Sequence, residues 1–555
     1  MALIEFQRKQ FEDEFGKLDE EMKDRIAMFG TPIDHLDEQK IHLEVFPNRP
    51  DLISFQGFKR AFLAFLGKKT GLIDYKLNKP EKDYTVVIDS SVKDVRPYTA
   101  CAIIKGLKLD NFRIKEIVDI QEKLHLTIGR KRKKLAIGVY PLDKIKLPIT
   151  FKALEPDKIK FTPLDAEREM SGLEILQKHV TGKEYAHLLA GKQKFPLFVD
   201  ADNKILSMPP IINSLATGKI TSETKDVFVE CSGFDFEILK KCLNIITTCL
   251  ADMGGKIYQM EIKTGIIGIT KKVLTPDFAP EKMRLSIENT NKLLGLELKE
   301  KQIKTCLEKM GHGYKDEDVF VPSWRTDVLH EVDLIEDIAI AYGYENFVSE
   351  IPSISTIGGE DKKETIKRKI AEILAGLGLL EVSNYHLTSK NEQFTNMGIP
   401  EKQEKSFNVI EVENSKTDFK ILRKDLSHYL MKNLSENIDA EYPQRIFELG
   451  KTFSIDPKTD KITEKESLAV ALTPGNFTEL KQTLEYLFKM LDIKISISEP
   501  SSIPQHLIEG RVIEIKIGDT TIGTLGEVHP KILKNWKIKM PVALMEINLE
   551  PILNR

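Results

Sequence analysis

The chain has 555 residues, of which 41% are hydrophobic and 30% charged, and its formal net charge is −3 at pH 7. This composition predicts several soluble domains, and the small charge excludes a global positive field that would attract nucleic acid. The five cysteines form no CxxC pair, which argues against a zinc ribbon or a disulfide framework. Since no apolar run reaches about 18 residues and the N-terminus lacks an apolar signal core, we expect a cytoplasmic protein without a membrane span.

The first segment, residues 1–90, combines helix and strand patterns. FEDEFGKLDEEMKDRIAMFG shows a helical pattern that stops at Gly30, and IHLEV alternates as a strand does. PNRPD breaks that strand, and a helix with Phe62, Phe65 and Leu66 on one face follows. The polar YKLNKPEKD near residue 80 is expected to be a linker, so the segment predicts a small α+β domain.

The second segment, residues 91–275, mixes strands with helices. RIKEIVDIQEKLHLTIG predicts a helix ending at Gly129, and the strand-like LAIGVY follows soon after. KFPLFVDADNKILSMPPIINS predicts a hairpin with its turn at DADNK. The β-rich VFVECSG precedes FDFEILKKCLNIITTCLADMGG, which predicts a helix closed by Gly254 and Gly255. We therefore expect an α/β domain here.

Residues 276–348 are expected to form a small helical, winged-helix-like domain. Ser286 can cap the helix IENTNKLLG, and the helix KEKQIKTCLEKMG and the strand DVFVPSW follow.

Residues 360–555 begin with the helix KKETIKRKIAEILAGLG and continue in strand-like runs: EVSNYHL, NVIEV, RIFELGKTFSI, SLAVALT, RVIEIKIGD, TIGTLGEV and VALMEINL. The whole chain thus predicts an α+β, multidomain fold whose last module contains an antiparallel sheet.

The densest group of carboxylates lies in RTDVLHEVDLIEDIAIAYGY, residues 325–344. On a helix, Asp333, Glu336 and Asp337 share one face, and Asp327 could join them. Carboxylates held together repel one another, so they should raise a pKa or bind a hard cation such as Mg²⁺. Acids on the solvated face of a helix, near its N-terminus, would have the same spacing. The spacing alone leaves both interpretations open.

The strongest basic patch is GRKRKK, which contains five consecutive cations: Arg130, Lys131, Arg132, Lys133 and Lys134. Such a run could bind phosphates, or it could be a solvated turn that places cations at a helix C-terminus.

The histidines show no metal-ligand spacing, and His125 is expected to be a packed or capping residue rather than a base. AGLGLLE and MGHGYKDE follow helices instead of strands, so neither predicts a dinucleotide or phosphate loop.

The order of five motifs resembles the β subunit of phenylalanyl-tRNA synthetase, of the archaeal/eukaryotic type. The motifs are EVFPNRPDLIS, QEKLHLTIGRKRKKLAIGVYPLDKI, MPPIINS with VFVECSG, VPSWRTDVLHEVDLIEDIAIAYGY, and LGEVHPKILKNW. They cover nearly the whole chain. The resemblance implies a subunit that binds tRNA(Phe) and partners a catalytic α subunit, usually in an α₂β₂ heterotetramer. The α subunit is the one expected to activate phenylalanine with ATP and to charge the tRNA.

The resemblance also implies that the second segment edits, by hydrolysing tyrosine wrongly attached to the tRNA. A merely hydrophobic pocket cannot reject an added hydroxyl strongly, whereas a buried acceptor can select it. Glu230 matches the family position that reads the tyrosine hydroxyl, and Ser207, Ser214 and Ser232 match as further polar groups of the pocket. Gly138 falls about where bacterial relatives have an editing histidine, so no general base is assigned. The hydrolytic water would then be positioned by backbone and by the tRNA's terminal ribose.

Two further expectations come from the resemblance. Asp327, Asp333, Glu336 and Asp337 match the Mg²⁺ ligands of the family, in a structural or interface site. The last segment matches a degenerate class II synthetase module, because RIFELGKTF is only weakly similar to the second class II motif and the late G-x-G-x-x-R is absent. This module is expected to act as a scaffold for the α subunit without binding ATP.

Two other functions stay open on the sequence. The chain could be a stand-alone nucleic-acid-binding protein that uses its third segment and RKRKK. It could also be a free-standing hydrolase of mischarged tRNA. Association with an α subunit distinguishes both from the ligase subunit.

Overall fold

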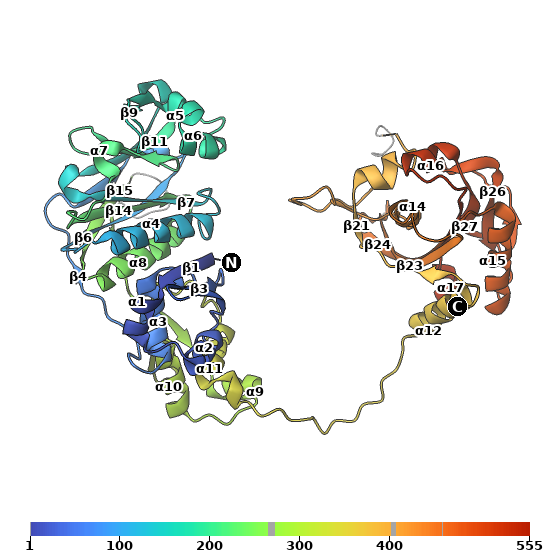
Figure 1. The fold of residues 1–555 in the computed structure, drawn as a ribbon, viewed down its shortest axis with the longest axis horizontal. Helices are drawn as coiled ribbons and strands as arrows, with labels where there is room; N and C mark the ends of the chain where they lie inside the picture. Colours follow the sequence, from blue (N-terminus) through green and yellow to red (C-terminus); the bar gives the residue numbers. More distant parts are fainter. Residues whose placement is uncertain (1, 265–271, 401–406, 458, 555) are drawn as a thin grey trace. The chain divides into compact units, whose positions relative to one another are not determined.

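The computed structural model describes residues 2–264, 272–400, 407–457 and 459–554. The chain divides into two compact units, unit 1 with residues 1–351 and unit 2 with residues 352–555. Each unit combines helices with several sheets (Figure 1), so the predicted α+β, multidomain class is confirmed. In the described part of the chain, no helix is both long enough and apolar enough to cross a membrane. All five cysteines are buried and unpaired.

Unit 1 begins with a three-stranded antiparallel sheet in the order β1-β3-β2. The predicted helical pattern that stops at Gly30 is confirmed, but it is divided into two helices. Gly16 interrupts them with a φ of 108°, and the Asp19 carboxylate starts the second by accepting the Met22 N–H at 3.0 Å. The elements are β1 (Ala2–Gln7), α1 (Arg8–Phe15), α2 (Glu20–Met28), β2 (Ile33–Leu36), β3 (Lys40–Val45) and α3 (Phe55–Phe65).

A large mixed sheet follows, with the strand order β13-β12-β11-β8-β5-β15-β6-β14-β7, while β4 and β16 also pair with β15. The predicted hairpin is confirmed as β11 and β12. The stretch predicted as a linker is partly a strand, because it contributes β4 to this sheet. β9 and β10 form a separate two-stranded sheet. The strands of this segment are β4 (Leu77–Asn78), β5 (Thr85–Ile88), β6 (Tyr98–Lys105), β7 (Leu135–Pro141), β8 (Ile149–Leu154), β9 (Lys160–Phe161), β10 (Met170–Ser171), β11 (Phe195–Val199), β12 (Ile205–Met208), β13 (Ile212–Asn213), β14 (Val227–Gly233), β15 (Lys256–Thr264) and β16 (Lys272–Thr275).

Two long helices cover one face of this sheet (Figure 1): α8 packs on β6 and β14, and α4 packs on β7. The predicted helix before Gly254 is confirmed as α8, whereas α4 ends before Gly129. The other helices of this segment are short. The helices are α4 (Asn111–Leu126), α5 (Gly172–Lys178), α6 (Val180–Tyr185), α7 (Leu215–Gly218) and α8 (Phe236–Asp252).

The last part of unit 1 pairs three helices with a small antiparallel sheet in the order β17-β19-β18. As predicted, the Ser286 hydroxyl caps α9, accepting the Asn289 N–H at 3.1 Å. The elements are β17 (Glu281–Arg284), α9 (Ile287–Leu294), α10 (Glu300–Lys309), β18 (Gly313–Lys315), β19 (Asp318–Val321) and α11 (Glu331–Tyr342).

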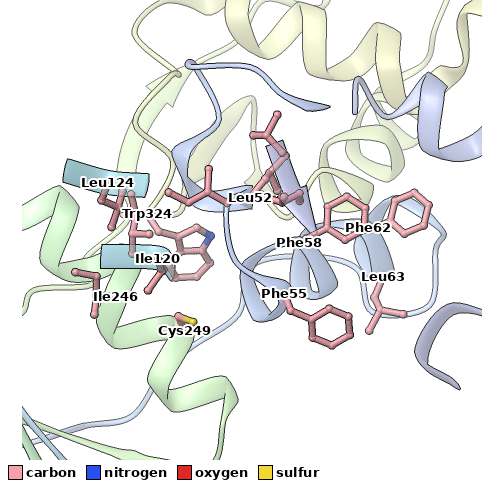
Figure 2. Close-up of a cluster of buried hydrophobic side chains, with 14 of the residues drawn as sticks. Leu52, Phe55, Phe58, Phe62, Leu63, Ile120, Leu124, Ile246, Cys249 and Trp324 are labelled. Carbon is pink, nitrogen blue, oxygen red and sulfur yellow. The ribbon is translucent and has the colours of Figure 1, made fainter. Parts of the chain in front are cut away.

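One apolar core joins the three sequence segments of unit 1 (Figure 2). Phe58 and Phe62 of α3 lie ring to ring at 5.1 Å in its N-terminal part, and Cys249 of α8 and Trp324 belong to the same core. A polar link lies beside it, because the Arg60 guanidinium lies 4.7 Å from the Trp324 ring and donates to the Asp252 carboxylate at 2.6 Å. Unit 1 is therefore held together by contacts between residues far apart in sequence.

Unit 2 contains a seven-stranded sheet in the order β20-β23-β24-β28-β27-β26-β25, antiparallel except between β20 and β23. The strand predicted at NVIEV is wrong: only an isolated bridge between Glu411 and Ile421 forms there. EVSNYHL supplies only the two short strands β20 and β21. The elements are α12 (Lys362–Gly376), β20 (Leu380–Glu381), β21 (Leu387–Thr388), β22 (Ile421–Leu422), α14 (Ser427–Glu436), β23 (Gln444–Ile455), β24 (Ile462–Thr473), α15 (Phe477–Met490), β25 (Ser496–Ser498), β26 (Leu507–Ile517), β27 (Thr520–Val528), α16 (Pro530–Asn535), β28 (Ala543–Asn548) and α17 (Glu550–Leu553).

The shared core makes a stability prediction. Phe62 is fully buried, so Phe62→Ala removes its ring contacts and should cost about 3–5 kcal/mol of unfolding free energy. We expect the melting temperature of unit 1 to fall by about 4–7 °C in a calorimetric scan. The control is Phe112→Ala, because that side chain is 63% exposed and should shift the melting temperature by less than about 2 °C. Equal shifts for the two variants would contradict the assignment of Phe62 to the core.

Candidate functional site

Strand β14 carries a buried carboxyl group on the face away from α8. Along the strand, Val229 and Cys231 pack into the core with α8, so Glu230 and Ser232 between and after them face the opposite side. Glu230 is only 2% exposed. Its Oε1 lies 3.2 Å from the Tyr140 hydroxyl, and its Oε2 has no hydrogen-bond partner among the described residues. The second oxygen is thus buried and available.

The Tyr140 hydroxyl organises the polar groups around Glu230. It also lies 2.8 Å from the Ser207 Oγ and 3.3 Å from the Asn213 Oδ1, so one proton has three acceptors within reach. These groups come from β7, β12, β13 and β14, which the sheet brings together. The resulting network orders the polar wall of the site.

Gly138 lies directly opposite Glu230 in the pairing of β7 with β14. A Cβ at this position would lie 2.1 Å from the Tyr140 hydroxyl oxygen, because the tyrosine side chain folds back over the strand. Any side chain would therefore collide with Tyr140. A histidine at this position is incompatible with the Tyr140 arrangement, which gives the glycine a physical reason.

A hollow of about 350 Å³ lies beside this network. Glu230, Ser207 and Asn213 line it together with apolar residues such as Ile137 and Val139. Ser232 and Ser214 are buried but do not line it: Ser232 contacts Arg96 and Ser214 precedes α7. The structure thus brings together two of the four predicted pocket residues at one hollow. As ligand-binding groups, all four stay predictions.

The electrostatics of this region depend on burial. Burial raises the pKa of Glu230 to about 8, although the Arg96 guanidinium and the hydrogen bond from the Tyr140 hydroxyl favour the charged form. Burial also lowers the pKa of Arg96 to about 10, and the nearby Glu230 carboxyl partly offsets this effect. Near neutral pH, Glu230 is therefore mostly a protonated carboxyl that can both donate and accept a hydrogen bond.

His125 also lines the hollow but has no free ring nitrogen to act as a base. Its Nε2 accepts the Ile137 N–H at 2.9 Å, and its Nδ1 lies 3.3 Å from the Glu122 carboxylate. Burial lowers its pKa, so it is neutral with Nδ1 protonated. The prediction of a packed, structural histidine is confirmed.

The basic run forms a tight turn after α4. Arg130, Lys131 and Arg132 have φ values of 46°, 55° and 62°, and the side chains of the run are exposed except for that of Arg132. Arg132 donates to the Ile211 carbonyl at 2.9 Å and to the Glu122 carboxylate at 2.8 Å. It therefore ties the turn to the floor of the hollow. As tRNA contacts, all five cations stay predictions.

Two of the four predicted metal ligands share one arginine. The Arg325 guanidinium lies 2.7 Å from the Asp327 carboxylate and 2.8 Å from that of Asp337. Asp337 also lies 2.6 Å from His312 Nε2. Burial opposes its ionisation, but Arg325 and His312 hold the pKa of Asp337 well below its usual range.

The other two predicted ligands lie nearer to solvent on α11. The Asp333 carboxylate caps the helix by accepting the Leu329 and His330 N–H groups at 2.7 and 2.8 Å, and Glu336 is exposed. All four acids line one hollow of about 650 Å³ between α11 and the PNRP turn. Within the described ranges, however, no three acidic, histidine or cysteine side chains are arranged to hold a metal ion. Because three of the acids already have partners, the residues of this chain alone do not fit a metal site.

Comparison with known proteins decides the family. Residues 83–246 match the B3/4 domain, residues 283–344 the tRNA synthetase B5 domain, and residues 348–549 the phenylalanyl tRNA synthetase beta chain CLM domain. The chain is 40% identical over 512 residues to the phenylalanine–tRNA ligase beta subunit of Thermococcus sibiricus, an alignment that covers 91% of this chain and 89% of that protein. The chain belongs to the phenylalanine–tRNA ligase β-subunit family. The predicted resemblance is confirmed, and the chain is thereby a subunit of an aminoacyl-tRNA ligase.

Other members of this β-subunit family are also similar. The beta subunit of Archaeoglobus fulgidus is 36% identical over 531 residues, covering 95% of this chain and 94% of that protein. Among solved structures, an N-terminal fragment of the phenylalanyl-tRNA synthetase β-subunit from Pyrococcus horikoshii matches with a TM-score of 0.58 and 37% identity. It covers 61% of this chain and 99% of the fragment.

Sequence reasoning missed Tyr140, Asn213 and Arg96. LAIGVYP is buried throughout and therefore shows no alternation that would assign its tyrosine to a face. Asn213 reaches the site because its strand, β13, pairs with β12. Arg96 reaches it through a hydrogen bond to Ser232, which is 136 residues away in sequence. Local sequence patterns encode neither contact. The available signal was a charged or polar residue inside an otherwise apolar run, and it pointed only to Glu230.

The raised pKa of Glu230 makes a pH-dependent prediction. The folded chain holds the proton more tightly than the unfolded chain, whose value is near 4.5, so stability should fall as pH rises from 4.5 to 8. Glu230→Gln removes this loss and should stabilise the chain by on the order of 5 kcal/mol at pH 8.5, with little effect at pH 4.5. Denaturant melts at the two pH values measure it.

The control for this experiment is Glu237→Gln on α8, because that side chain is exposed. It should change stability by less than about 0.5 kcal/mol at either pH. If Glu230→Gln stabilised the chain equally at both pH values, its effect would be one of packing and not of ionisation.

Proposed function

We propose that this chain supplies the editing activity of its ligase by hydrolysing Tyr-tRNA(Phe) in the hollow beside Glu230. We propose that an α subunit carries the charging site for ATP, phenylalanine and tRNA(Phe). The observation that carries the proposal is the buried and unpartnered Oε2 of Glu230 at a hollow of about 350 Å³. The family membership supplies the context, because these proteins are subunits of a tRNA ligase.

The unpartnered oxygen supports selection of tyrosine over phenylalanine. A buried polar group without a hydrogen bond costs about 1–3 kcal/mol, and the hydroxyl of a tyrosyl group would supply the missing bond. A phenylalanyl group of the same shape would leave Glu230 unsatisfied. Sites built around such a hydrogen bond reject the analogue that lacks it far better than apolar pockets reject an added hydroxyl.

The surrounding residues would bind and orient the substrate. Ser207 and Asn213 add polar contacts beside Glu230, and Ile211 and Ile212 supply apolar surface for the aromatic ring. Within the described part of this hollow we assign no general base, since both nitrogens of His125 are engaged. We propose that the attacking water is positioned by backbone groups and by the hydroxyl of the terminal ribose.

We further propose a division of labour between four segments: residues 1–90, the editing domain 91–275, the metal-binding helical domain 276–348 and the synthetase-like domain 360–555. Three helices with a small antiparallel sheet support the winged-helix-like description of the third segment. The seven-stranded, almost entirely antiparallel sheet supports the degenerate class II description of the fourth. We propose that this last domain is a scaffold for the α subunit, in an α₂β₂ assembly of the cytoplasm.

The editing proposal predicts a selective defect. Glu230→Ala removes the hydroxyl partner and should slow release of tyrosine from Tyr-tRNA(Phe) by about 10- to 100-fold, in line with the loss of a buried hydrogen bond. Charging of tRNA with phenylalanine by the complex should not change. The measurement is deacylation of preformed Tyr-tRNA(Phe) by the complex with its α subunit.

Glu237→Ala serves as the matched control, since it removes an exposed acid a few residues further along the chain. It should deacylate at the parent rate. Unchanged tyrosine release by a folded Glu230→Ala variant would remove Glu230 from the editing role.

The metal proposal requires the partner, because this chain alone does not fit an ion. We propose that Mg²⁺ binds at Asp327, Asp333, Glu336 and Asp337 only in the complex with the α subunit. Magnesium should then raise the melting temperature of the complex and not of the chain alone. Asp333→Asn with Glu336→Gln keeps the polar shape but removes two charges, and should abolish this rise or lower the yield of the assembly measured by light scattering.

The control pair is Glu288→Ala with Glu297→Ala, two exposed acids of the same segment. It should keep the magnesium-dependent rise in melting temperature. If the Asp333/Glu336 variant showed the same rise as the parent, these carboxylates would be rejected as ligands.

Association with the α subunit tests the other functions. A chain that stays monomeric in the presence of the α subunit would favour a free-standing hydrolase or nucleic-acid-binding protein.

A further inference from the structure

A second cavity, of about 640 Å³, lies next to the Glu230 hollow. Its wall includes four basic residues and no acid among the described residues that line it. The residues that matter here are Arg96, Lys133, Lys134, His187, Pro210 and Phe234. A cavity with only basic ionisable side chains in its wall attracts an anion.

Arg96 gives this cavity a built charged group. It is 2% exposed, and it donates from Nε to the Ser232 hydroxyl at 3.1 Å and from Nη2 to the Ser232 carbonyl at 2.6 Å. Its Nη1 has no partner within the described chain. The guanidinium is therefore fixed by the strand, while one donor stays open at the cavity wall.

An aromatic side chain completes the cavity. Phe234 is 51% exposed, and its ring centroid lies 5.5 Å from the Arg96 guanidinium carbon. An exposed ring among cations is the combination with which proteins bind single-stranded nucleic acid, since bases stack on the ring and phosphates pair with the cations. A simple anion site would not need an exposed ring.

The cavity and the hollow share one lining residue, Pro210. Glu230 lies in β14, and Phe234 directly follows the last residue of that strand. Four residues of extended chain span roughly 13 Å. The two spaces are thus separated by about the length of one strand segment, with Ser232 and its partner Arg96 between them.

We propose that this cavity binds the 3′-terminal nucleotide of the aminoacylated tRNA, with its phosphate on Arg96, Lys133 and Lys134 and its base on Phe234. The aminoacyl group would then extend into the Glu230 hollow. This inference rests on the proposed editing function, because it assigns the rest of the same substrate to the neighbouring space. It also divides the basic run: Lys133 and Lys134 line the cavity, whereas Arg130 and Lys131 do not.

The division of the basic run supplies a matched pair of variants. Lys133→Ala with Lys134→Ala should weaken binding of the RNA trinucleotide CCA to the full chain about 10-fold and should reduce the salt dependence of binding, since two phosphate contacts are lost. Arg130→Ala with Lys131→Ala removes the same charge from the same turn and should change affinity less than 2-fold. Equal weakening by both pairs would overturn the proposal in favour of a diffuse charge effect.

Variants at Phe234 distinguish binding of a nucleotide from binding of free phosphate. Phe234→Leu should weaken CCA binding about 5-fold or more, whereas Phe234→Trp should retain it, because stacking requires an aromatic ring. Inorganic phosphate should bind more weakly than CCA and should not respond to Phe234→Leu. Phosphate that binds as tightly as CCA would overturn the assignment of a nucleotide.

Deacylation kinetics separate this inference from the editing proposal. In the complex with the α subunit, Lys133→Ala with Lys134→Ala should raise KM for Tyr-tRNA(Phe) several-fold with little change in kcat, because the contacts are made equally before and during the reaction. If the parent complex did not deacylate Tyr-tRNA(Phe), the editing function itself would be rejected. Deacylation that is normal in the parent and unaffected by both the lysine pair and Phe234→Leu would reject only the nucleotide cavity.

Discussion

The burial of α8 against α3 is the contact on which the site depends. Phenylalanines of α3 and apolar side chains of α8 share one core, and α8 also supports β14 from behind. With its Val229 side fixed in this way, β14 has only one direction in which to present Glu230. The packing energy of an apolar core thus holds a carboxyl group away from water, and this burial changes its chemistry.

Asp337 and Glu230 are both buried carboxyl groups of unit 1, but their ionisation states differ. Asp337 stays ionised because Arg325 and His312 surround it, which makes it a structural ion pair. Glu230 has Arg96 nearby but forms no ion pair with any described residue, and it stays mostly protonated instead. A group of the first kind is satisfied by its own chain. A group of the second kind keeps an unused oxygen, which is why we assign ligand recognition to β14.

Sequence patterns predicted local structure better than they predicted the site. Amphipathic periodicity placed α8, α9 and the hairpin of β11 and β12, because burial of one face imposes that periodicity. The break at Gly16 was missed, since the helical pattern on both sides is similar. The acidic helix was predicted correctly as a helix, but spacing could not show that Arg325 would pair with both Asp327 and Asp337. Such pairing depends on how the side chains pack, which local periodicity does not describe.

Gly138 and Tyr140 are coupled through space in a way that constrains how this protein family can change. A histidine at 138 collides with the tyrosine, and a smaller residue at 140 removes a contact to Glu230, Ser207 and Asn213. Each single step is therefore unfavourable, although the double change is sterically permitted. A side chain at position 138 therefore requires a simultaneous change at position 140, so the two positions can be exchanged only as a pair.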